Sequence, residues 1–241
     1  MATLALDKSA VDKFSVPLYS IAEAARYLRL NDGTFRSWAR GYTTRVGKRT
    51  VTGQPIITDL GRPGQRGPAI PFVGLAEGYA LAAIRKAGVP LQRIRPALDR
   101  LSKEIGLGYA LASKRLYTDG AEVLYDYAQM ADDEEAEALA GLTVVRDGQR
   151  VFAEVVRDYL RRITWGSDGY VVAIPLPGYT QSEVVADIRR GFGQPTFKHG
   201  GARLEDVLAL FYAGESGATV AEEFGLTQVE VEDAIRVDKK N

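Results

Sequence analysis

Apolar positions between residues 19 and 41 recur at helical spacing in two short blocks separated by a polar turn. The apolar residues of the first block share one helical face: Ile21, Ala24, Ala25 and Leu28. Ser20 and Glu23 have the spacing of a capping box, which predicts where this first helix begins. Asn31 can cap a second helix and Gly41 can end it, so the stretch predicts two short helices around a tight turn.

The second predicted helix has two chemically different faces. Phe35, Trp38 and Ala39 would pack inward, whereas the opposite face carries small polar and basic side chains: Thr34, Arg36, Ser37 and Arg40. Such side chains on an exposed second helix suit the major groove of DNA. The pair therefore predicts a helix-turn-helix, with an ordinary helical hairpin as the alternative.

The segment after this pair, residues 43–71, is rich in Gly, Pro, Thr and Arg. Its pattern predicts two short strands or loop edges at 45–51 and 55–58, with glycine turns between them, and a returning strand at 69–73. A basic loop directly after a helix-turn-helix occupies the position of a wing. Arg45, Lys48 and Arg49 are then candidates for contacts with phosphates or the minor groove. A solvated basic loop without a target is the alternative.

The rest of the chain alternates helical and extended patterns. Helices are expected at 74–88, 89–105, 109–115, 153–163, 202–212 and 219–224, and strands at 121–128, 170–176 and 184–188. Asp147 and Gly148 predict the turn of a hairpin over 142–152, and the acidic run 132–137 predicts a solvated surface. Thr227 and Glu230 repeat the capping-box spacing at the start of a last helix.

These elements predict a mixed α+β fold that is mostly helical. We expect a winged helix-turn-helix domain with supporting helices over 1–118, a small central α/β unit over 119–192, and a C-terminal trihelical, homeodomain-like domain over 193–241. The last helix of that third part carries Glu230, Glu232 and Asp233. Because phosphate repels carboxylates, we expect this third part to contact protein rather than DNA.

The formal net charge is zero, from 31 basic and 31 acidic residues, but the charge is unevenly distributed. Residues 19–66, the basic segment, contain nine basic and three acidic residues, whereas residues 201–241, the acidic segment, contain four and nine. This asymmetry predicts different partners at the two ends. The chain has no cysteine, so no disulfide or thiolate metal site is possible.

The sequence offers little support for catalysis or for a membrane location. The single histidine, His199, lies among glycines in an expected turn, and no phosphate-binding loop or cluster of metal ligands is present. No apolar run approaches the roughly 20 residues of a membrane span, and the N-terminus lacks the pattern of a signal peptide. We therefore expect a cytoplasmic protein that is not an enzyme and uses no cofactor or metal.

Two parts of the chain resemble known families. Gly193 to Arg203, Gly214-Glu215-Ser216 and Ala221 to Thr227 resemble the domain-of-unknown-function-433 family, although Gly-Gly-Ala-Arg stands where that family often has Gly-Thr-Arg. The resemblance implies a VapB-like antitoxin encoded beside a PIN-domain, VapC-like ribonuclease toxin. The N-terminal half resembles MerR-type winged helices, through Tyr19-Ser20-Ile21 and the run from Thr34 to Trp38.

Two functions remain open at this point. The first is an antitoxin that neutralises a ribonuclease toxin and, as a homodimer on operator DNA, represses its own operon. For this function Arg236, Lys239 and Lys240 are candidate toxin contacts. The second is a MerR-like transcription regulator whose central unit senses a small molecule. Its candidate pocket residues are aromatic: Tyr125, Tyr127, Trp165 and Tyr170.

Overall fold

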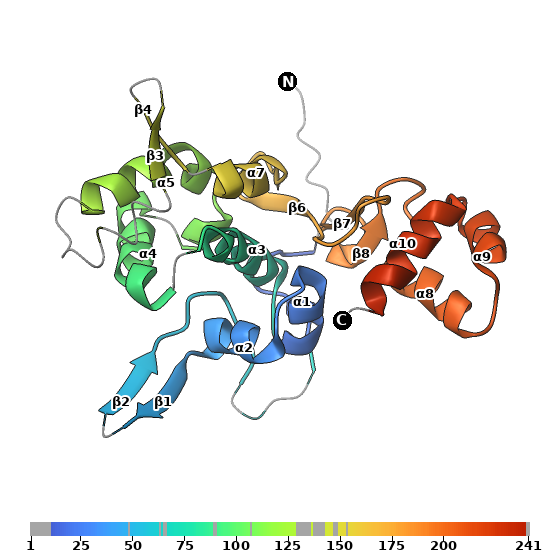
Figure 1. Ribbon diagram of the computed structural model, residues 1–241, viewed down its shortest axis with the longest axis horizontal. Helices are drawn as coiled ribbons and strands as arrows, with labels where there is room; N and C mark the ends of the chain where they lie inside the picture. Colours follow the sequence, from blue (N-terminus) through green and yellow to red (C-terminus); the bar gives the residue numbers. More distant parts are fainter. Residues whose placement is uncertain are drawn as a thin grey trace, which may run out of the picture.

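The structure is a computed structural model of the chain. It describes residues 11–47, 49–62, 64, 67–88, 91–106, 108–128, 136, 143–146, 149–152 and 154–239. Figure 1 shows its elements arranged around one central helix, with the β1–β2 hairpin at one extremity and the last three helices at another.

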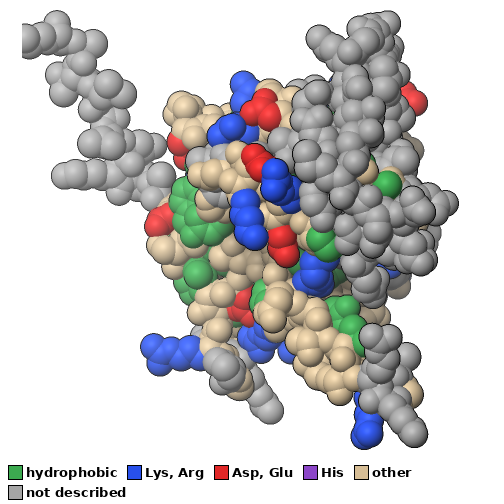
Figure 2. Space-filling view, turned by 90° about the vertical axis from the view of Figure 1, so that its left-hand side faces the viewer, with side chains coloured by type: hydrophobic (Ala, Val, Ile, Leu, Met, Phe, Trp, Pro, Cys, Tyr) green, Lys and Arg blue, Asp and Glu red, His purple; other side chains and the backbone are tan. Residues whose placement is uncertain are grey.

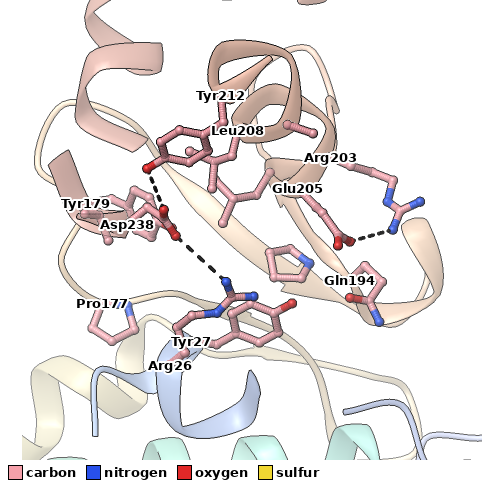
Figure 3. A pocket seen from close by; sticks show the side chains of 14 residues that line it. Arg26, Tyr27, Pro177, Tyr179, Gln194, Arg203, Glu205, Leu208, Tyr212 and Asp238 are labelled. Atoms are coloured by element: carbon pink, nitrogen blue, oxygen red, sulfur yellow. Dashed lines mark hydrogen bonds and ion pairs between the residues drawn. The ribbon is translucent and has the colours of Figure 1, made fainter. Parts of the chain in front are cut away.

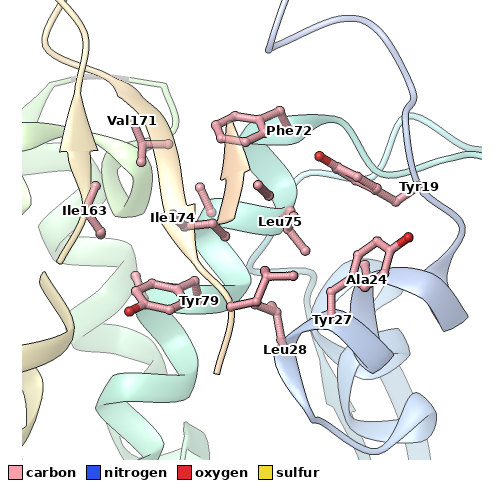
Figure 4. Packing of buried hydrophobic residues seen from close by; sticks show 14 of the residues in the cluster. Tyr19, Ala24, Tyr27, Leu28, Phe72, Leu75, Tyr79, Ile163, Val171 and Ile174 are labelled. Carbon is pink, nitrogen blue, oxygen red and sulfur yellow. The ribbon is translucent and has the colours of Figure 1, made fainter. Parts of the chain in front are cut away.

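The central helix is α3 (Phe72–Lys86), and twelve of its fifteen residues are buried. It contacts α1, α2, α7, β6 and the 3-10 turn η1. A helix that is apolar on all sides has to be covered on all sides, which explains its central position. Figure 4 shows Phe72, Leu75 and Tyr79 of this helix among side chains of α1 and β6.

The two N-terminal helices, α1 (Ile21–Leu28) and α2 (Asp32–Arg40), begin where the capping residues predict. Ser20 and Glu23 form both hydrogen bonds of the capping box, and Asn31 Oδ1 accepts the N–H of Gly33 at 2.9 Å. Phe35, Trp38 and Ala39 are buried, as their spacing predicts. The outward face of α2 is thereby fixed by burial of its inward face.

The segment after α2 forms the antiparallel hairpin β1 (Tyr42–Val46) and β2 (Arg49–Gly53). The stretch expected as a strand or loop edge at 45–51 is divided between the two strands. Residues 55–58 form a loop rather than a strand, because the N–H groups of Ile56 and Ile57 donate to the Trp38 carbonyl at the end of α2. The strand expected at 69–73 is reduced to one bridge between Ile70 and Tyr19, since α3 already begins at Phe72.

Beside α3 lie α4 (Leu91–Ile105), η1 (Ala110–Ala112) and α5 (Lys114–Ala128). The strand expected at 121–128 is wrong, because those residues continue α5, which packs along α4. The short helix expected at 109–115 is instead η1 followed by the start of α5.

The hairpin β3 (Thr143–Arg146) and β4 (Gln149–Phe152) confirms the expected pairing. Its turn, 147–148, and nearly all of the acidic run 132–137 lie outside the described residues.

Helix α7 (Glu154–Arg161) leads into an antiparallel sheet whose strands are ordered as in the chain. The strands are β5 (Thr164–Trp165), β6 (Val171–Pro175), β7 (Val184–Asp187) and β8 (Pro195–Phe197), with the 3-10 turn η2 (Gly191–Gly193) before β8. Every residue of β6 is buried, and this strand contacts α3. The sheet thus closes the core opposite the N-terminal helices.

Three helices complete the chain: α8 (Leu204–Tyr212), α9 (Gly217–Phe224) and α10 (Gln228–Asp238). Thr227 and Glu230 form the second predicted capping box, at the start of α10. α5 runs across the expected division at residue 119, and β8 lies beyond the expected division at residue 193 yet pairs with β7.

Asp233 of α10 ties these last helices to the sheet. Its buried carboxylate accepts the backbone N–H groups of Thr180, Gln181 and Ser182 at 2.8 to 3.0 Å, and it pairs with Arg236. These donors hold the pKa of Asp233 well below its usual range, although burial alone would raise it. Asp233, one of the three acids expected to repel phosphate, therefore faces the loop between β6 and β7.

We predict that Asp233→Asn lowers the free energy of unfolding by about 2–4 kcal/mol at pH 7, because an amide replaces a charged acceptor of several hydrogen bonds. A carboxyl with a depressed folded-state pKa stabilises above its unfolded pKa and loses that contribution as pH falls. The difference in the free energy of unfolding between wild type and variant, measured by urea unfolding, should therefore decrease as the pH is lowered from 5 to 3. Glu232→Gln, on the exposed side of α10, is the control, and an equal loss there would contradict the role of Asp233.

Candidate nucleic-acid interface

The outward face of α2 carries one exposed cation in the described structure, Arg36. Thr34 and Ser37 are half-buried beside it, and the Ser37 hydroxyl donates to the Thr34 carbonyl at 2.7 Å. Three of the four predicted α2 residues thus share an accessible surface. A guanidinium flanked by small hydroxyl side chains is chemically able to hydrogen bond to base edges and phosphates.

Arg40, the fourth predicted residue of α2, is placed differently. Its Nε donates to Oδ2 of Asp59 at 2.7 Å, and the Asp59 side chain is only 7% exposed. The other carboxylate oxygen of Asp59 accepts the Gly61 N–H at 2.6 Å. Arg40 therefore fastens the end of α2 to the segment that returns from the hairpin.

The same returning segment is held from the other side by Glu77 of α3. Glu77 is 4% exposed, and its Oε2 accepts the backbone N–H of Thr58 at 2.6 Å. Gly74, one turn earlier, lies against the Thr58 carbonyl so closely that an added Cβ would be 2.3 Å from it. Burial raises the pKa of Glu77 to about 7, although the hydrogen bonds from Thr58 oppose the shift.

The hairpin projects beyond these contacts and carries the predicted Arg45, which is exposed. Lys48 and the side chain of Arg49 lie outside what the structure describes. At the base of the hairpin, the Tyr42 ring packs against Gly53, where a Cβ would be 2.3 Å from the ring. Arg95 of α4 donates to the Gln54 carbonyl and lies 5.9 Å from the centre of the Tyr42 ring. The base of the hairpin is thus held against α4.

We call α1, α2 and the β1–β2 hairpin, residues 21–53, the reading head. In Figure 2, Lys and Arg side chains project from the lower end of the molecule, at the level where Figure 1 places this hairpin. Both signs of charge mix over the upper part of the described surface in that view. Among the described residues of the reading head, Arg26, Arg36 and Arg45 are exposed, so this part of the chain presents cations to solvent.

The three predicted toxin contacts do not form a common free surface in the described structure. The Arg236 guanidinium donates to the Gly178 carbonyl at 2.9 Å and pairs with Asp233, so it belongs to the joint between α10 and the sheet. Lys239 is exposed, with its Nζ 5.9 Å from the centre of the Phe211 ring. Lys240 lies outside the described residues.

A cavity of about 230 Å³ separates α1 from the C-terminal helices. Figure 3 shows Arg26 and Tyr27 of α1 on one side and Leu208 and Tyr212 of α8 on the other. Across it, Arg26 and Asp238 form a long ion pair of 3.9 Å, and the Tyr212 hydroxyl donates to Asp238 at 2.8 Å. Trp165 and Tyr170, two of the aromatic residues expected to form a pocket, are not among its lining residues, and the side chains of Tyr125 and Tyr127 lie outside what the structure describes.

Sequence reasoning missed the groups that position the reading head, chiefly Asp59, Glu77 and Arg95. A signal existed for Glu77, because it is the one acid in an otherwise apolar stretch from Phe72 to Ile84.

His199 is exposed and lies 3.4 Å from the carboxylate of Glu230. Among the described residues, no group of His, Asp or Glu is arranged to hold a metal ion. The described helices are all too short or too polar to cross a membrane.

Comparison with known protein families identifies the class. Residues 17–98 match a family described as "Putative DNA-binding HTH domain", which spans the reading head, α3 and part of α4. The chain thus carries an N-terminal helix-turn-helix DNA-binding domain.

Comparison with individual proteins identifies the family. The chain is 46% identical over 226 residues to "Putative antitoxin VapB45" of Mycobacterium tuberculosis, covering 92% of this chain and 94% of that protein. It belongs to the same family as that protein. "Uncharacterized protein Rv2308" of the same organism is 29% identical over 238 residues, covering 97% and 95%. The crystal structure of Rv2018 from Mycobacterium tuberculosis superposes with a TM-score of 0.79 at 44% identity, covering 93% of this chain and all of that one.

We predict that Glu77→Gln changes how stability depends on pH. A carboxyl whose folded-state pKa is raised stabilises below its unfolded pKa, and that contribution is lost as pH rises through the folded value, here about 7. The difference in the free energy of unfolding, variant minus wild type, should therefore be about 2 kcal/mol larger at pH 8 than at pH 5. The measurement is urea unfolding of both proteins across this pH range. If the free energies of unfolding of wild type and variant change in parallel with pH, the prediction is contradicted.

Proposed function

We propose that the protein is an antitoxin that binds operator DNA through its reading head and neutralises a toxin. The observation that carries the DNA-binding part is the exposed Arg36 on α2, followed directly in the chain by a hairpin that carries the exposed Arg45. The antitoxin part is supported by the family relationship to the protein named VapB45.

In this proposal the reading head acts as a winged helix-turn-helix of MerR-like type. The residues around Arg36 enter the major groove, and Arg45, Lys48 and Arg49 of the hairpin contact the flanking phosphates. Arg40 acts indirectly, because its ion pair with Asp59 fixes the end of α2 relative to the hairpin. A homodimer would place two such heads about 34 Å apart on a two-fold operator.

The toxin in this proposal is a PIN-domain, VapC-like ribonuclease that binds the C-terminal trihelical part, α8 to α10. The acidic segment that forms these helices would be repelled by phosphate and is suited to a polypeptide partner. One protein can then hold DNA at one end and toxin at the other. Such an arrangement would repress the operon while the toxin stays inhibited.

We predict that Arg36→Ala weakens operator binding about 5- to 150-fold, which corresponds to about 1–3 kcal/mol, and relaxes sequence preference. Arg45→Ala should weaken binding to operator and to unrelated DNA alike and reduce the salt slope by about one. Arg190→Ala, which removes an exposed arginine beside η2, is the matched control. Mobility-shift titrations at several salt concentrations measure all three, and equal effects of Arg36→Ala and Arg190→Ala would contradict the proposal.

One observation favours a second function, a MerR-like regulator that senses a small molecule. The cavity between α1 and α8 joins the reading head to the C-terminal helices, so an occupant could change their relative position (Figure 3). Its walls combine aromatic and aliphatic side chains with a few charged groups, as in small-molecule sites.

Filling this cavity distinguishes the two functions. We predict that Leu208→Trp leaves operator affinity and toxin binding within about threefold of wild type, since an antitoxin needs no occupant there. The expected melting temperature also stays within about 4 °C, because small losses of packing shift it by that order. Loss of a metabolite that copurifies with wild type, together with altered operator affinity, would instead establish the sensor.

A further inference from the structure

A shallow groove of about 620 Å³ runs between α8 and α9, on a part of the molecule that no predicted site includes. Its floor is apolar and incompletely covered, because Leu210 and Phe224 are half-buried and Ala209 and Ala213 are exposed. The short side chains of the two alanines keep the groove open along α8. A surface of this shape can accept the apolar face of another helix.

The rim of the groove is acidic. Three exposed acidic residues line the groove beside its apolar floor: Asp206, Glu215 and Glu223. Asp206 has a cationic neighbour, Arg203, at 4.0 Å, whereas the described structure shows no ion pair for Glu215 or Glu223. Carboxylates gathered in this way repel one another, and a cation placed between them would relieve the repulsion.

We propose that this groove binds an amphipathic helix of the toxin that carries lysines or arginines along the edges of its apolar face. The inference rests on the proposed function and locates toxin binding on α8 and α9, apart from Arg236, Lys239 and Lys240. The charge of the rim selects a cationic partner and excludes DNA. The nine residues of α8 offer a length of about two and a half turns, which suits anchors at positions i, i+4 and i+7.

Such a site also leaves the reading head unobstructed. The lining residues of the groove all belong to α8, α9 and the segment between them, whereas DNA binding is assigned to α2 and the hairpin. Toxin and operator can therefore be bound by one chain at the same time. Electrostatic attraction across the rim would mainly accelerate association, so affinity should fall with salt.

Charge reversal in the full chain tests the groove. The variant Glu215→Lys/Glu223→Lys places two like charges in front of the cationic partner, and its affinity for the PIN-domain toxin should fall about 100-fold. The matched control, Glu222→Lys/Glu232→Lys, makes the same change in net charge at exposed positions outside the groove, and should stay within about threefold. Operator affinity, measured on both variants, confirms that each is folded.

The outcomes separate the inference from the proposed function. If wild type binds no PIN-domain toxin encoded beside it, the proposed function fails. If wild type binds the toxin and the groove variant binds it equally well, or the control loses as much as the groove variant, the groove is not the site. The inference is supported if only the groove variant loses affinity for the toxin. It is supported further if exchanging the helix lysines of the toxin for glutamates partly restores the affinity of the groove variant.

Discussion

The geometry of the reading head depends on two carboxylates that hold one short segment. Glu77, buried in the central helix, accepts the N–H of Thr58, and Asp59 next to it pairs with Arg40 at the end of α2. The segment between hairpin and α3 is thereby fixed to the core and to α2 at once. Because neither strand nor helix stabilises this segment, these polar contacts fix it to α2 and α3, while Arg95 of α4 holds the base of the hairpin. A buried carboxylate without such donors would be costly.

The uneven distribution of charge gives the two ends of the molecule different chemistry. The basic segment carries the exposed Arg36 and Arg45, while the acidic segment forms α8, α9 and α10. One of its acids, Asp233, is used internally to join α10 to the sheet. Others form the rim of the α8–α9 groove. A protein with zero net charge can therefore present one surface to phosphate and another to a cationic polypeptide.

Local signals predicted the helix starts and the outward face of α2, because a capping box or a buried Phe35–Trp38 pair acts within a few residues. The strand predicted at 121–128 failed because alternating tyrosines resembled a strand, whereas Ala121 and Leu124 are buried at helical spacing in α5. The partner of Arg40 could not be predicted, since Asp59 lies 19 residues away in an irregular segment. Long-range pairing of this kind leaves no periodic trace in a sequence.

The most direct test of the account uses the absence of cysteine from the chain. A single cysteine in Thr34→Cys, labelled with iron–EDTA, would cleave DNA wherever α2 lies, and the same label in Ala213→Cys reports the α8–α9 groove. The account predicts cleavage from position 34 in the two half-sites of the operator, centred about 34 Å apart, and none from position 213. Cleavage from position 213, with none from position 34, would contradict it.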